Sequence, residues 1–157
     1  MRRALATLVL AALLPAAATW AAPAPAAEVE ARYRQAAAAF HTLEQDAGAT
    51  APQWRAVAEQ FRAIHGAAPD GRRGADALYS AALACRQTWR VSAEWRDLSR
   101  AVAHFREFAS RYPEDRLADD ALMYLAALLS EGYTDLPAAR ETYQRLIESY
   151  PEGDQRP

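Results

Sequence analysis

The sequence has no lysine, and it contains only six glycines and one cysteine in 157 residues. The single cysteine, Cys85, excludes an internal disulfide, so the folded state must depend on its hydrophobic core. The hydrophobic fraction of 52% excludes a disordered chain. The cationic side chains are all arginines, and 20 acidic residues outnumber them to give a net charge of −2. This mildly acidic balance argues against nucleic acid as a partner, because phosphate binding requires clustered positive charge.

The first 26 residues have the pattern of a signal peptide. Arg2 and Arg3 precede an apolar run over residues 4–14, which is shorter than the ~20 residues that a membrane span needs. Small residues follow, and they allow cleavage after Ala21 or after Ala26. No cysteine lies nearby to carry a lipid. We therefore expect a periplasmic protein that is not a lipoprotein and has no stable membrane span after cleavage; an uncleaved N-terminal anchor is the alternative.

Apolar residues recur at three- and four-residue spacing through most of the remaining chain, and no segment alternates like a strand. The spacing predicts a helical repeat domain over residues 27–154, followed by a short tail at 155–157. Six amphipathic helices form three hairpins in this prediction, at about 29–66, 74–112 and 116–150. Each helix is too short to be stable alone, so it must pack against its neighbours.

Prolines and capping residues mark the ends of these helices. Pro52 suits the first turn of the second helix, and Asp135 can cap the sixth. The fourth helix begins at Ser92 or as late as Asp97, which the sequence does not decide. Three prolines lie just beyond the second, fourth and sixth helices, where a helix cannot continue: Pro69, Pro113 and Pro151.

Aligning the chain on these three prolines reveals an internal repeat. Residues of similar size stand at equal distances before each proline: Val57, Ala101 and Ala139; then Phe61, Phe105 and Tyr143; then Ile64, Phe108 and Leu146. A repeated helix–turn–helix unit cannot bury its apolar face alone, so the hairpins must stack. We expect the aromatic positions to lock each hairpin to its neighbours.

The last unit resembles a tetratricopeptide repeat. Its residues match the large, small, alanine, aromatic, apolar and proline positions of that family: Met123, Ala127, Ala139, Tyr143, Leu146 and Pro151. The chain departs from the family pattern at Ser130, where tyrosine is preferred, and at Leu83, where a small residue is preferred. The resemblance implies an all-α fold with three antiparallel helical hairpins in a short right-handed superhelix.

Two segments resemble the envelope subtype of this family: residues 117–122, Leu-Ala-Asp-Asp-Ala-Leu, and residues 149–151, Ser-Tyr-Pro. The leader followed by three hairpins is most similar to the N-terminal region of some bacterial N-acetylmuramoyl-L-alanine amidases. This implies an exported, non-catalytic scaffold that binds a protein or peptide of the cell envelope and is linked to peptidoglycan processing and the cell-wall machinery. The alternative is that the chain is the non-catalytic front region of such a zinc-dependent amidase.

The sequence predicts no catalytic centre, metal site or cofactor in this chain. His41, His65 and His104 fall on different predicted helices, and none belongs to a zinc-binding motif of the amidase or metalloprotease type. We interpret them as histidines of helix surfaces and Cys85 as a core residue. The adjacent Asp119 and Asp120 favour the start of a helix through its dipole rather than acid–base chemistry.

The resemblance also implies where a partner binds. Repeat domains of this type use the surface lined by the first helix of each hairpin. In the second hairpin the matching residues are Ala77, Ser80, Ala84, Gln87 and Thr88; in the third they are Ala121, Tyr124, Leu128 and Glu131. Trp95 is a further candidate, because it lies in an inserted segment outside the repeat pattern.

Overall fold

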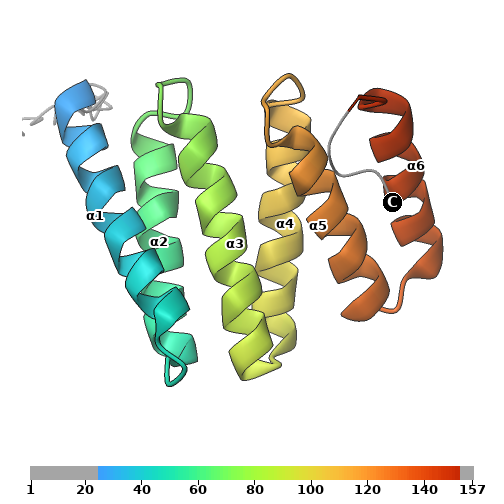
Figure 1. The fold of residues 1–157 in the computed structure, drawn as a ribbon, viewed down its shortest axis with the longest axis horizontal. Helices are drawn as coiled ribbons and strands as arrows, with labels where there is room; N and C mark the ends of the chain where they lie inside the picture. The colour runs from blue at the N-terminus through green and yellow to red at the C-terminus, as the bar shows by residue number, and fades with distance from the viewer. Residues whose placement is uncertain (1–24, 153–157) are drawn as a thin grey trace, which may run out of the picture.

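The computed structural model describes residues 25–152, so the predicted signal peptide lies almost entirely outside the described residues. The described part consists of six helices without strands: α1 (Ala26–Gln45), α2 (Ala51–Ala67), α3 (Gly74–Ser92), α4 (Trp95–Arg111), α5 (Ala118–Glu131) and α6 (Leu136–Ser149). Each helix packs against those before and after it in the chain. The helices run alternately up and down in Figure 1, and α2 and α4 lie behind α1 and α3. The predicted all-α class and hairpin arrangement are confirmed.

The helix ends show how local sequence sets these boundaries. Pro52 lies in the first turn of α2, and the Asp135 carboxylate accepts a hydrogen bond from the Ala138 N–H at 3.1 Å, as predicted. Helix α4 begins at Trp95, between the two starts that the sequence left open. Ala93 ends α3 in the left-handed conformation with φ of 54°, which reverses the chain within two residues.

Most of the repeat positions that the prolines predicted lie in the core. Phe61, Phe105, Ala101 and Ala139 are all buried. The Phe105 ring contacts Tyr79 of its own hairpin and Tyr124 of the next hairpin, at centroid distances of 6.0 and 5.4 Å. Phe105 therefore links two hairpins, as the repeat predicts.

Tyr143 differs from this prediction. It occupies the position equivalent to Phe105, yet 37% of its surface is exposed. The reason is its place in the stack, because α6 is the outermost described helix and contacts only α5 extensively. Tyr143 therefore does not have the buried position that was expected for a residue that locks its hairpin to its neighbours.

Two of the repeated prolines accept a hydrogen bond from a tyrosine of the next hairpin. The Tyr112 hydroxyl donates to the Pro69 carbonyl at 2.7 Å, and the Tyr150 hydroxyl donates to the Pro113 carbonyl at 2.6 Å. Each turn is thereby tied to the preceding one by a tyrosine that stands directly before the next proline. The first turn has Ala68 at the equivalent position.

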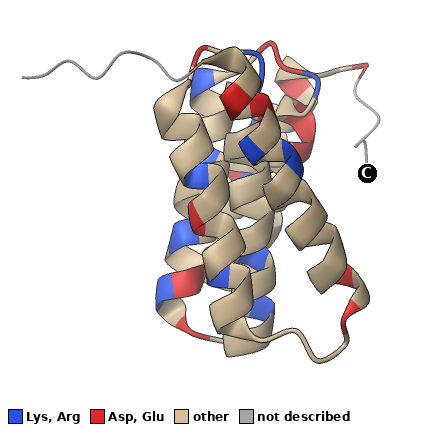
Figure 2. Cartoon of the chain, turned by 90° about the vertical axis from the view of Figure 1, so that its left-hand side faces the viewer, with Lys and Arg blue, Asp and Glu red and all other residues tan. Residues whose placement is uncertain are grey.

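Arginines join successive hairpins through ion pairs. The Arg55 guanidinium donates two hydrogen bonds to Asp97, at 2.6 and 3.1 Å, and Arg62 donates to Glu107 at 3.1 Å. The Arg55 guanidinium lowers the pKa of the Asp97 carboxyl below its usual range. Blue and red residues alternate on the side shown in Figure 2, without a large patch of one sign. Arginines such as Arg55 and Arg62 therefore support the stack of helices.

None of the described helices is both long enough and apolar enough to cross a membrane.

Candidate peptide-binding face

Helices α3 and α5, the first helices of their hairpins, meet along a polar and aromatic surface that we name the α3/α5 face. It includes four of the predicted partner-binding residues, Ser80 and Gln87 on α3 and Tyr124 and Glu131 on α5, whose side chains are partly or fully exposed. The Arg86 guanidinium lies 4.8 Å from the centre of the Tyr124 ring. This cation–π contact connects the two helices directly.

Leu128 is a correction to the predicted site. It is only 1% exposed and so cannot contact a partner without rearrangement of the core. The other small or apolar residues placed on this surface by the repeat register are buried as well: Ala77, Ala84, Thr88 and Ala121. They lie on the sides of α3 and α5 that pack against the preceding hairpin. These predicted positions therefore face the core of the stack and not solvent.

Sequence reasoning missed several residues on the same two helices. The partly exposed side chains of Leu83 and Arg86 on α3 and of Met123 and Ala127 on α5 lie between or beside the predicted positions. Leu83 and Arg86 are three residues apart, and Met123 and Ala127 are four apart, so each pair lies on one side of its helix. This spacing was the signal in the sequence that could have found them. Leu83, Met123 and Ala127 add apolar area to this face.

Trp95 belongs to α4 and so is not part of the α3/α5 face. It is the first residue of α4, is 62% exposed, and packs edge-to-face on Tyr133 with ring centroids 4.9 Å apart. The Tyr133 hydroxyl is within 2.9 Å of the Ser99 hydroxyl, which fixes the ring. The structure thus leaves Trp95 as a separate exposed aromatic site at the end of the molecule that carries the α3–α4 turn (Figure 1).

Two of the three histidines come together, contrary to the prediction of scattered surface residues. His65 is buried, and its Nε2 lies 3.6 Å from Glu107; His104 Nδ1 lies 3.9 Å from the same carboxylate. Arg62 also donates to Glu107. Among the described residues, no group of three histidine, cysteine or acidic side chains is arranged to hold a metal ion. The cluster is a set of polar contacts between α2 and α4.

Lowering the pH from 6.5 to 4 should destabilise the fold through His104. Burial, together with the charge of Arg62, lowers the pKa of His104 from 6.5 to about 4. Within that window the unfolded chain binds a proton at His104 and the folded chain does not, so the stabilisation present above pH 6.5 is lost as the pH falls. We expect a loss of about 3 kcal/mol in urea unfolding experiments. His104→Gln should flatten this slope; an unchanged slope in the variant would contradict the assignment.

Cys85 and the paired aspartates have structural roles, as predicted. Cys85 is buried, and burial raises the pKa of its thiol to about 12, so the reactive thiolate does not form near neutral pH. Asp119 and Asp120 lie in the first turn of α5, where the Asp119 carboxylate accepts the Asp120 N–H at 2.9 Å. Neither feature adds chemistry to the α3/α5 face.

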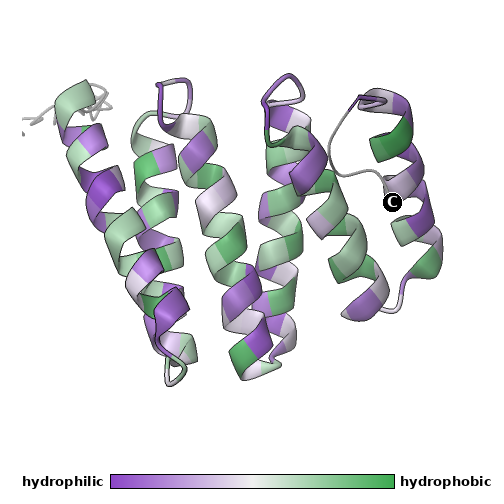
Figure 3. Cartoon of the chain, in the orientation of Figure 1, coloured by the Kyte–Doolittle hydropathy of each residue, from purple (hydrophilic) through white to green (hydrophobic). Residues whose placement is uncertain are grey.

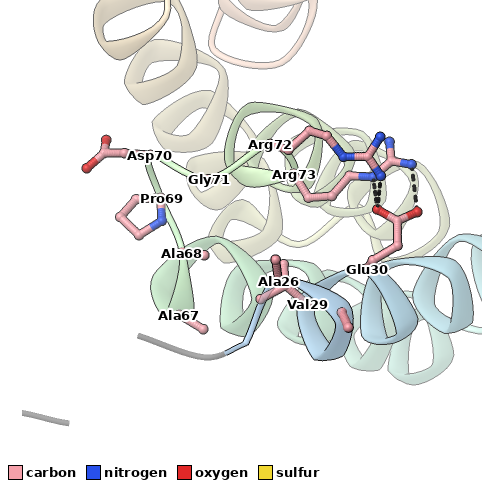
Figure 4. A pocket seen from close by; sticks show the side chains of 11 residues that line it. Ala26, Val29, Glu30, Ala67, Ala68, Pro69, Asp70, Gly71, Arg72 and Arg73 are labelled. Atoms are coloured by element: carbon pink, nitrogen blue, oxygen red, sulfur yellow. Dashed lines mark hydrogen bonds and ion pairs between the residues drawn. The ribbon is translucent and has the colours of Figure 1, made fainter. Parts of the chain in front are cut away.

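A cavity of about 580 Å³ lies at the start of α1 and beside the α2–α3 turn. Four alanines, Val29 and Pro69 form its apolar walls, and the ion pairs of Glu30 with Arg72 and Arg73 lie on one side (Figure 4). These arginines, Arg73 first, lower the pKa of Glu30 to about 2. Ala68 lines the cavity at the position where the other hairpins have Tyr112 and Tyr150, so a small side chain leaves space there.

Comparison with known proteins identifies one unit of the stack. Residues 120–153 match the Tetratricopeptide repeat family, and this range includes nearly all of α5 and the whole of α6. No curated protein and no solved structure matches the chain. The match and the six stacked helices together show a tetratricopeptide-like helical protein. Proteins built from this repeat generally mediate contacts between proteins and are typically non-catalytic.

Proposed function

We propose that this protein is an exported, non-catalytic scaffold that binds a segment of a protein or peptide partner on the α3/α5 face. The observation that carries the proposal is the cluster around Tyr124, where an aromatic ring and the Arg86 guanidinium lie next to polar side chains on two stacked helices. Tetratricopeptide-type hairpins present their first helices to partners, and α3 and α5 are the first helices of their hairpins.

The side chains of this face suit an extended peptide. Ser80 and Gln87 can donate and accept hydrogen bonds, which the backbone of an extended segment requires. The Tyr124 ring offers area for an apolar side chain at little cost in conformational entropy. Because its ring already contacts Arg86 and Phe105, Tyr124 is held in place before a partner arrives.

The cellular setting is part of the proposal and is supported by sequence alone. The leader pattern in residues 1–26 supports export to the periplasm. The resemblance of the repeats to those of amidase N-terminal regions supports a partner in the cell-wall machinery. If the DNA that follows codon 157 encodes the zinc ligands of an amidase, the chain is instead the non-catalytic front region of that enzyme.

Replacing Tyr124 and Glu131 together by alanine should weaken partner capture at least about tenfold, because an interface depends on a few central side chains. The tagged double variant and wild type would be exposed to the same envelope fraction, and bound proteins quantified by mass spectrometry. The matched control is Glu59→Ala with Gln60→Ala, which removes two exposed polar side chains from α2. Equal capture by the Tyr124/Glu131 variant and the wild type would refute the α3/α5 face, and reduced capture after Trp95→Ala would move the site there.

A further inference from the structure

The last helix leaves open a face that the inner helices bury. We define the α6 outer face by four exposed residues: Leu136, Arg140, Tyr143 and Ile147. The equivalent residues of α4 are all buried, since α5 packs on them: Leu98, Val102, Phe105 and Ala109. Leu136 and Ile147 are among the exposed large hydrophobic residues of the molecule, and Figure 3 shows apolar segments along α6 at its edge.

The first helix has the complementary open face. Tyr33 of α1 contacts Phe61 as Tyr79 of α3 contacts Phe105, which aligns α1 with α3. We define the α1 outer face by four exposed residues, Ala31, Gln35, Ala38 and Thr42. Their equivalents in α3 are all buried: Ala77, Ala81, Ala84 and Thr88.

Local hydrogen bonds support this alignment. Thr42 donates to the Ala38 carbonyl and Thr88 donates to the Ala84 carbonyl, both at 2.9 Å. The outermost helices of the described part therefore present both halves of an interface that forms twice inside the stack, between α2 and α3 and between α4 and α5.

We propose that the α6 outer face of one molecule binds the α1 outer face of a second copy, so that the stack of hairpins continues from molecule to molecule. This contact uses neither Ser80 nor Tyr124 and is independent of the proposed function. It is a head-to-tail contact, because two different surfaces meet, and it extends to longer assemblies unless a ring closes.

If α6 of one molecule meets α1 of the next as α4 meets α5 inside the chain, the side chains that lie opposite each other are compatible. Tyr124 stacks on Phe105 inside the chain, and their equivalents at the junction are Arg34 and Tyr143, a cation–π pair. Val102 and Leu125 are replaced at the junction by Arg140 and Gln35, so that polar residues meet polar residues.

Apolar and small residues match in the same way at both ends of the junction. Leu98 lies against Gly132 in the chain, and the equivalent pair at the junction is Leu136 with Thr42. Ile147 of α6 is equivalent to Ala109 of α4, and Ala31 of α1 is equivalent to Ala121 of α5. Because both alanines are buried, Ile147 and Ala31 would meet in the junction.

The cavity at the start of α1 is lined by Ala68 and Pro69 of the α2–α3 turn (Figure 4). Within the chain, the space before each turn is occupied by a tyrosine that reaches the previous proline, such as Tyr112 at Pro69. In the continued stack, the neighbour's turn at Pro151 would lie beside the cavity at Ala68. The proposed contact would thus cover this mainly apolar space.

A mixing experiment tests the proposal. Ala38→Arg adds bulk and charge to the α1 outer face, and Ile147→Glu adds charge to the α6 outer face. Both residues are exposed, so the fold should be retained, which circular dichroism would check. The matched controls are Ala103→Arg, at an exposed alanine of α4, and Val91→Glu, at a residue with the same 51% exposure as Ile147. Sedimentation velocity of the protein as its host produces it would measure mass against concentration.

We expect wild type and both controls to grow beyond dimers as concentration rises, and each face variant alone to remain a monomer. An equimolar mixture of the two face variants should form a dimer, because each supplies the face that the other lacks. A wild type that stays monomeric at every concentration would overturn the proposal. So would unchanged assembly of Ala38→Arg with loss only in Ile147→Glu, which would indicate a twofold α6–α6 dimer.

Discussion

Replacing Phe105 by alanine is expected to lower the free energy of unfolding by about 3–5 kcal/mol, the range for removing a large side chain from a packed core. Phe105 is completely buried and contacts Tyr79 and Tyr124, which belong to two different hairpins. Its removal leaves a cavity at the junction of those hairpins. Urea unfolding followed by circular dichroism measures the loss.

Tyr143→Ala is the matched comparison for this substitution. The position is equivalent in the repeat but partly exposed in the single chain, so we expect a loss of about 1 kcal/mol or less at a concentration where the protein is a monomer. A loss at Tyr143 as large as that at Phe105 under these conditions would contradict the exposed position of Tyr143. A small loss at both positions would show that the repeat register is wrong.

Gly74→Ala should destabilise the protein by about 2–3 kcal/mol, the upper part of the range for overpacking. A Cβ atom at residue 74 would lie 1.8 Å from the Pro69 carbonyl oxygen, which is backbone and cannot rotate away. The turn between α2 and α3 would have to open, and the contact of His65 with the Gly74 carbonyl at 3.0 Å would be disturbed.

The same substitution at Gly66 should have the opposite sign. Gly66 lies within α2, and nothing stands within 4 Å of the position that its Cβ would occupy. Alanine favours a helix over glycine, so we expect a gain of about 0.5–1 kcal/mol. Thermal unfolding of both variants in parallel provides the measurement. Equal effects of the two substitutions would contradict the close approach at Gly74.

The helices and their pairing followed from local patterns in the sequence. Apolar spacing located the helices, and prolines such as Pro113 located the turns, because both depend on residues close in the chain. The buried position of Phe105 followed from its equivalence to Phe61. These inferences required no knowledge of how the hairpins are rotated against each other.

The features that the sequence did not predict depend on that rotation. A helical period identifies a stripe of small residues, but it does not say which neighbour covers the stripe, so Leu128 was assigned to the wrong side. His65 and His104 meet at Glu107 only because α2 and α4 lie next to each other in the stack. The exposure of Tyr143 is an effect of its place at the end of the stack, which equivalence within a repeat does not reveal.

Photo-cross-linking in the native host tests the central claim, an exported scaffold that binds a partner on the α3/α5 face. A photoreactive residue would replace Gln87 on that face or Ala103 on the exposed side of α4, and mass spectrometry would identify each adduct and the N-terminus of the chain. We expect a specific envelope partner from position 87 only, joined to a chain that begins at Ala22 or Ala27. The same products from both positions, or an adduct that retains Met1, would contradict the account.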